Sequence, residues 1–190
     1  MYPIHIFGDK GQGGTYLLRI HLQTATELTF GRFQHGKRFT LPLGDYIYVG
    51  SALNPRGATS LAPRLLRHAT RTGERPPHPI RERLLERFLE LEMGSAQLRP
   101  PKTKKLYWNV DHLIDLLEAD LVGVFAIRSP HRLEAELGQW LAAGPGTEIV
   151  VPGLGANDAP GGTHLLEVTG GEAWWSTLPE FLTTLLAAKG

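Results

Sequence analysis

The sequence predicts an α+β fold, in which a small and mainly antiparallel sheet is flanked by helices. Short apolar segments of strand-like pattern gather in the first 50 residues, whereas longer segments with helical spacing follow mostly after residue 59. Strands and helices do not alternate regularly, which argues against a doubly wound parallel sheet. The chain has 190 residues, so we expect a single domain over residues 1–190.

The first strands are expected to form a β-meander. Residues 8–14 are rich in turn-forming glycine, and residues 15–22 then form an apolar strand. Residues 27–33 alternate between apolar and polar side chains and are expected to pair with that strand. A turn at 41–44 leads to a third strand at 45–50 beside them.

Helices are expected in the remaining chain. Thr59 or Ser60 can cap the first helix, which runs to about residue 69 with Pro63 in its first turn. Two further strands are expected at 121–128 and 164–168. Long Gly/Pro-rich loops in compact domains are often functional, and one covers residues 144–162. The other expected helices cover residues 79–93, 110–118, 131–143 and 178–188.

Composition excludes several classes of protein. Cysteine is absent, which excludes a disulfide framework and fits a reducing compartment. No secretory signal and no membrane-spanning segment is evident, so we expect a cytoplasmic protein with no membrane partner. The net charge of +1 does not itself favour nucleic acid, although arginines gather over residues 56–87. That stretch is either a local basic face or a solvated surface without a partner.

Common cofactor motifs are missing. The glycines of residues 11–14 lack the spacing of a dinucleotide fingerprint and precede a strand instead of a helix. There is no phosphate-binding loop of the Gly-Lys-Ser/Thr type. The eight histidines are scattered, so we do not expect a zinc site.

One constellation is informative. Tyr16 and Tyr48 lie on two predicted strands, and a helix carrying Arg64 and His68 follows. Arg64 and His68 are four residues apart and therefore share one helix face. If the strands pair, both tyrosines converge at one end of the sheet, where Gly50 allows a backbone to pass closely.

The segments Gly14-Thr15-Tyr16 and Tyr48-Val49-Gly50 resemble the two signature tripeptides of the GIY-YIG nuclease superfamily. The segments 107–113 (YWNVDHL) and 152–165 resemble two motifs of one uncharacterised branch, whose members stand alone or are fused to endonuclease III-like repair proteins. The similarity runs from about residue 14 to 168. It implies a core over 14–168 with a helical insert at 71–105, and the helix expected at 178–188 follows this core.

The resemblance also implies a chemistry, namely metal-assisted hydrolysis of phosphodiester bonds. Arg64 stands at the family's catalytic arginine, Tyr48 at the tyrosine that activates water, and Tyr16 and His68 complete the catalytic set. Glu134 is expected to bind Mg²⁺ or Mn²⁺, with Glu136 as the second choice. The expected substrate contacts are Arg67, Asn157, Asp158 and His164.

Departures from the family pattern leave other functions open. Tyr107 and Asn109 replace two family histidines, and Ala135 and Ala159 replace two cysteines. Besides a nuclease that acts on DNA more readily than RNA, and that takes part in repair, the chain could be a non-catalytic nucleic-acid-binding module. A third alternative is a protein-interaction domain that uses the 79–93 helix.

Each of these residues also has an ordinary structural role open to it. A single strand tyrosine usually serves packing, and Asp158 and His164 could be a turn cap and a strand-start hydrogen bond. Trp108 and Asp111 are expected to be a packing anchor and a helix cap.

Overall fold

A six-stranded sheet forms the centre of the molecule in the computed structural model, which describes residues 3–8, 11–155 and 163–189. The strand order is β1-β6-β2-β5-β8-β7. Neighbouring strands are antiparallel except for the parallel pair β1 and β6, so the α+β class with a mainly antiparallel sheet is confirmed. The strands are β1 (Ile4–Gly8), β2 (Gly14–Leu22), β5 (Gly44–Ala52), β6 (Ala119–Arg128), β7 (Thr147–Glu148) and β8 (Leu165–Val168).

The expected β-meander is wrong. The central strand β2 pairs with β5 on one side and with β6 on the other, so neither of its edges is open to a further strand. The strand β3 (Thr26–Thr29) instead pairs with β4 (Arg38–Leu41) in a separate two-stranded sheet, and the 3-10 turn η1 (Phe33–Gly36) lies between them. The first strand, β1, was not expected, because it offers only the short alternation of Ile4 and Ile6 as a signal.

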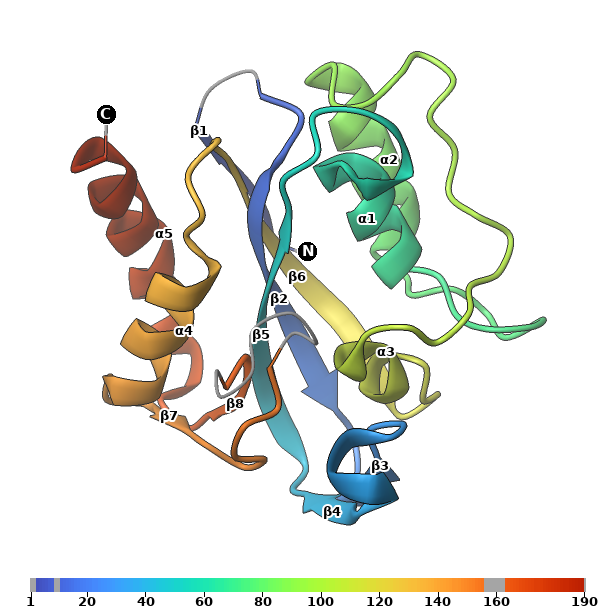
Figure 1. The fold of residues 1–190 in the computed structure, drawn as a ribbon, viewed down its shortest axis with the longest axis vertical. Coiled ribbons are helices and arrows are strands. Elements are labelled where there is room, and N and C mark those ends of the chain that lie inside the picture. Colours follow the sequence, from blue (N-terminus) through green and yellow to red (C-terminus); the bar gives the residue numbers. More distant parts are fainter. Residues whose placement is uncertain (1–2, 9–10, 156–162, 190) are drawn as a thin grey trace.

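Helices cover both faces of the sheet (Figure 1). One face carries α1 (Leu61–His68), α2 (Arg81–Glu90) and α3 (Asn109–Ile114), and the other carries α4 (Glu134–Ala143) and α5 (Gly171–Ala187). Because side chains alternate along a strand, β2 places Tyr16 and Leu18 in the first core and Leu17 in the second. No helix in the described part of the chain is long and apolar enough to cross a membrane.

The helix termini differ from the expectations in detail. Ser60 precedes α1 as expected, but its hydroxyl donates to the carbonyl of Gly57 at 2.8 Å and does not cap the helix. Pro63 lies in the first turn of α1, where it removes no helical hydrogen bond. The last helix begins at Gly171, well before the expected residue 178, and Pro179 lies within it without ending it.

The helix expected over 79–93 forms as α2, and its apolar face belongs to the main core. Leu84 and Phe88 are fully buried in the same cluster of side chains as Tyr16. Removing this segment would therefore expose the core beneath α1. That the segment is an insert relative to other members of the superfamily stays a prediction.

Candidate active site

A polar cavity of about 350 Å³ lies where the ends of β2 and β5 meet the helix α1. The segment 107–108 before α3 and the segment 132–134 at the start of α4 complete its wall. Four of the residues expected from sequence line it together, namely Tyr16, Tyr48, Arg64 and Glu134. These residues come from both layers of helices and from two strands, so the cavity depends on the whole fold.

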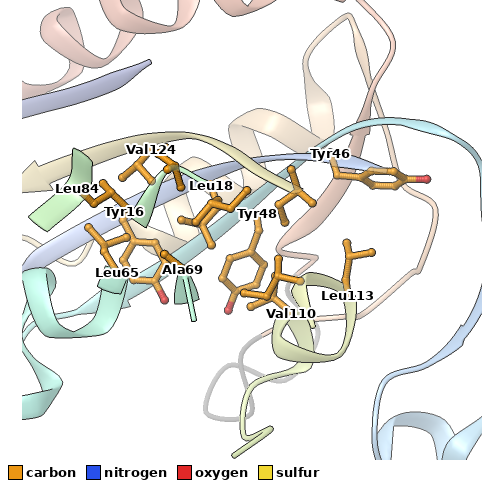
Figure 2. Packing of buried hydrophobic residues seen from close by; sticks show 14 of the residues in the cluster. Tyr16, Leu18, Tyr46, Tyr48, Leu65, Ala69, Leu84, Val110, Leu113 and Val124 are labelled. Atoms are coloured by element: carbon orange, nitrogen blue, oxygen red, sulfur yellow. The ribbon is translucent and has the colours of Figure 1, made fainter. Parts of the chain in front are cut away.

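Tyr16 and Tyr48 stand on the same face of the sheet, with their ring centroids 6.4 Å apart. Their hydroxyl groups point in the same direction, away from the sheet, whereas Tyr46 points elsewhere (Figure 2). Tyr16 is paired in register with Gly50, and a Cβ atom on Gly50 would lie 2.5 Å from the Tyr16 hydroxyl. Gly50 therefore makes room for the Tyr16 ring and not, as expected, for a passing backbone.

Both tyrosines hold their protons at neutral pH. Burial raises the pKa of Tyr16, and the nearby positive charge of Arg64 offsets this only in part. Burial likewise raises the pKa of Tyr48 well above its ordinary value. The two phenols are therefore hydrogen-bond donors in the resting protein and not phenolates.

His68 lies behind Tyr16, and its Nε2 atom is 2.8 Å from the Tyr16 hydroxyl. Burial lowers the pKa of His68 to about 4, so the imidazole is neutral near pH 7. The Nδ1 atom faces Asp111 Oδ1 at 3.4 Å. With the proton on Nδ1, beside this carboxylate, Nε2 accepts the hydrogen bond from Tyr16.

The guanidinium of Arg64 is held in place while most of its donors stay uncommitted. It stacks on the Trp108 ring, 3.8 Å from the ring centroid, and Nη1 donates one long hydrogen bond of 3.4 Å to the carbonyl of Ser51. A guanidinium carries five N–H donors in a planar fork that matches phosphate oxygens. Arg64 is thus positioned to bind an anion in the cavity.

Glu134 is the first residue of α4 and faces the same cavity. Its Oε2 accepts a hydrogen bond from the Ser51 hydroxyl, and its Oε1 lies 3.0 Å from His164 Nδ1. Burial raises the pKa of Glu134, but the hydrogen bonds from His164 and Ser51 outweigh that effect, and the net pKa is below the ordinary value. Glu134 is therefore a carboxylate at neutral pH.

A divalent cation in the cavity would have Glu134 as its one carboxylate ligand. Mg²⁺ commonly uses one or two carboxylates and fills its remaining positions with water and phosphate oxygens. Both Glu134 oxygens already have protein partners, Ser51 and His164, and Glu136 forms an ion pair with Lys189 at 2.9 Å outside the cavity. No group of three or more His, Cys, Asp or Glu side chains arranged around a common point occurs in residues 3–8, 11–155 and 163–189.

A second polar cluster lies behind the cavity, and we call Arg67, His68, Lys104 and Asp111 the buried ion cluster. Asp111 is fully buried and sits 2.9 Å from Arg67 Nη2 and 3.5 Å from Lys104 Nζ. It also accepts the backbone N–H groups of Tyr107 and Trp108 at the start of α3, which confirms the expected helix cap. Arg67, expected to contact substrate, is bound to Asp111 and does not line the cavity.

The buried ion cluster shifts the ionisation of its members. Burial raises the pKa of Asp111, but hydrogen bonds from His68 and Arg67 and the charge of Lys104 outweigh it, so the net pKa is far below the ordinary value. Burial lowers the pKa of Lys104 to about 8, and Asp111 counteracts this only in part. These partners lie up to 44 residues apart in sequence, so no local sequence pattern predicts the buried ion cluster.

The remaining expected residues are placed as follows. His164 is buried against Glu134 and acts on the cavity through that carboxylate. Asn157 and Asp158 lie outside the described residues. Sequence reasoning missed Ser51, which continues the YIYVG segment, and Arg132, which precedes the expected glutamate by two positions.

Comparison with known proteins gives one match. Residues 15–186 match a family described as a domain of unknown function, DUF123. No curated protein and no solved structure matches the chain.

Proposed function

We propose that this chain, which belongs to the family DUF123 by its match over residues 15–186, hydrolyses phosphodiester bonds in DNA with the help of a divalent metal ion. The family has no assigned function, so the proposal is drawn from the cavity itself. The observation that carries the proposal is the shared cavity lined by Tyr16, Tyr48, Arg64 and Glu134. The resemblance of the two tripeptides, which contain Tyr16 and Tyr48, to those of GIY-YIG nucleases also supports it.

The charges around the cavity favour a phosphate group. Arg64 and Arg132 line it together with the single carboxylate of Glu134, so its lining carries a net positive charge. Arg64 would bind the non-bridging oxygens with its fork and stabilise the charge that develops on them. A Mg²⁺ or Mn²⁺ ion bound through Glu134 would add positive charge beside the same phosphate.

In the proposed reaction, water attacks phosphorus and the bond between phosphorus and the leaving oxygen breaks. The resemblance assigns the activation of water to Tyr48, but we give this step to Tyr16, because its hydroxyl contacts His68 at 2.8 Å. The Tyr16 hydroxyl passes its proton to Nε2 of His68 as it takes up one proton from the attacking water. The leaving oxygen gains a proton from solvent. Tyr48, which keeps its own proton, donates a hydrogen bond that orients the water or a phosphate oxygen. His68 is neutral at pH 7, so Nε2 offers an unprotonated lone pair, and the Asp111 carboxylate beside Nδ1 would stabilise the imidazolium that forms against the cost of burial.

A cleavage assay tests the proposal. Purified protein would be incubated with labelled single-stranded, nicked, flapped and branched DNA, and with RNA, in Mg²⁺ or Mn²⁺. We expect cleavage of DNA that Tyr16→Phe, Arg64→Ala and Glu134→Gln each remove and that Tyr48→Phe lowers. Binding of DNA without cleavage of any substrate would replace the proposal by the non-catalytic binding module, which the raised pKa of both tyrosines also fits.

A further inference from the structure

Tyr107 is an exposed aromatic ring at the mouth of the cavity. It lines the same cavity as Tyr16 and Tyr48, which are 1% and 3% exposed, but Tyr107 itself is 69% exposed. This gradient of exposure places the phenols and Arg64 at the floor and Tyr107 at the rim. Packing of the protein does not account for so large an exposed ring.

The Tyr107 ring is nevertheless held in position. Its backbone N–H donates to Asp111 Oδ2 at 2.9 Å, and its ring meets Trp108 edge-on, with centroids 4.8 Å apart and planes at 69°. Trp108 is in turn fixed by Arg64 and Arg67, whose guanidinium carbons lie 3.8 Å and 4.4 Å from its ring centroid. A ring that is already placed loses little conformational entropy when a ligand stacks on it.

The chemistry of a nucleotide fits this arrangement of floor and rim. A phosphate bound by Arg64 would leave the attached sugar and base at the cavity mouth, where Tyr107 and the exposed Arg132 stand. Bases stack on aromatic side chains in proteins that bind single strands, and every base offers a face for this contact. Inside an intact duplex both faces are already covered by neighbouring bases, so only an unpaired and unstacked base can use the ring.

We propose that Tyr107 is a stacking platform for an unpaired base next to the bound phosphate, and that the substrate class is single-stranded or locally unpaired DNA. This inference rests on the proposed function, because the bound phosphate sets where the base lies. It gives a role to the position at which the related motif carries a histidine.

Binding of DNA without cleavage tests the stacking separately from the chemistry. A short fluorescein-labelled single strand would be titrated in EDTA and followed by anisotropy. We expect Tyr107→Ala to weaken binding about five- to 150-fold, the range expected for one lost base–aromatic contact. Tyr107→Phe should keep the wild-type affinity. Leu43→Ala, which removes another exposed apolar side chain (64% exposed), should change nothing.

Two further probes sharpen the result. A blunt duplex should bind wild type and Tyr107→Ala equally, and so should a single strand built from abasic residues. Equal affinity of wild type and Tyr107→Ala for the normal single strand would overturn the inference. An equal loss on single strand, duplex and abasic strand would also overturn it, because the ring would then act on the backbone or on the fold.

The outcomes separate the two proposals. One outcome is that single strands bind in a Tyr107-dependent way while no substrate is cleaved in Mg²⁺ or Mn²⁺. That result would support the stacking platform and reject the proposed nuclease activity. Cleavage that needs Arg64 but shows no preference linked to Tyr107 would leave the nuclease and remove the platform. If no nucleic acid binds, both proposals fail.

Discussion

Two polar clusters lie beside helix α1, and they differ in how far their hydrogen-bonding capacity is used. In the cavity, Arg64 donates one long hydrogen bond, and both tyrosines retain their protons. In the buried ion cluster, one turn further along the helix, Arg67 makes three short hydrogen bonds to Asp111 and to the carbonyl of Lys105. Both guanidinium groups contact the same Trp108 ring, but Arg67 is held by partners within the protein to a greater extent than Arg64.

This difference distinguishes side chains that stabilise the fold from side chains that are available to bind a ligand. A buried charge whose partners belong to the protein contributes to the fold, and removing one partner leaves the others uncompensated. A cation that keeps unused donors beside a polar cavity is prepared for a ligand. Substitutions on the two sides of Trp108 should therefore affect different measurements.

Replacing each arginine by alanine should give the largest difference between effects on cleavage and effects on stability. Arg64→Ala should lower DNA cleavage by about 10³-fold or more, since it removes the cation from the developing phosphate charge. Its unfolding free energy should fall by no more than about 2 kcal/mol, the value of a buried cation–π contact. Arg67→Ala should show the reverse, a larger loss in urea-unfolding free energy and a smaller loss in cleavage. Equal effects of both changes would remove the distinction.

Asp111→Ala should be the most destabilising change in the buried ion cluster. It leaves Arg67 and Lys104 without their shared carboxylate, so we expect a loss of about 3–5 kcal/mol in urea unfolding. The matched control is Glu27→Ala, which breaks an exposed ion pair to Arg38 and should cost less than about 1 kcal/mol. Similar losses in the two variants would show that the buried ion cluster does not hold the fold together.

Acid should weaken the fold through His68. Because its pKa is about 4 in the folded protein, below the ordinary value, the unfolded chain binds more protons between these values. Stability is therefore complete above about pH 6.5 and falls toward pH 4, by up to about 3 kcal/mol. Asp111 adds to the loss only at lower pH, because its pKa is also lowered and its proton uptake begins in the unfolded chain near pH 4.

Urea unfolding at several pH values checks this expectation. His68→Gln should flatten the slope between pH 6.5 and pH 4, whereas the exposed His131→Gln should leave it unchanged. An unchanged slope in His68→Gln would point instead to His78, a second buried histidine whose pKa is lowered by burial.

Gly50→Ala should cost about 1–3 kcal/mol of stability, less than Asp111→Ala, because the new methyl group meets the Tyr16 ring. A double-mutant cycle with Tyr16→Ala measures the clash directly. Once the ring is absent, the alanine should cost little, so the two changes should be strongly non-additive. Additive costs would place the strain elsewhere on β5.

The sequence indicated the cavity better than the sheet. Tyr16, Tyr48, Arg64 and Glu134 were nominated through the resemblance of their segments to the motifs of a known superfamily, and the cavity brings all four together. The pairing of β2 with β5 was considered, but the second partner, β6, was not, since it lies about a hundred residues away from β2 and an apolar strand can pair with any other apolar segment. The buried ion cluster was missed for the same reason, although Asp111 was recognised as a cap from its local position. Ser51 and Arg132 lay beside recognised motifs, but nothing in residue type alone marked them.

The distance in sequence between Tyr16 and Glu134 has a consequence for folding during synthesis. Tyr16, Tyr48, Arg64 and His68 are synthesised before Glu134, and β6 must pair with β2 before Glu134 can reach the cavity. A nascent chain that ends before α4 carries the phosphate-binding groups and lacks the residue proposed to hold the metal. Under the proposed function, a chain that has not yet formed α4 would therefore lack the complete site.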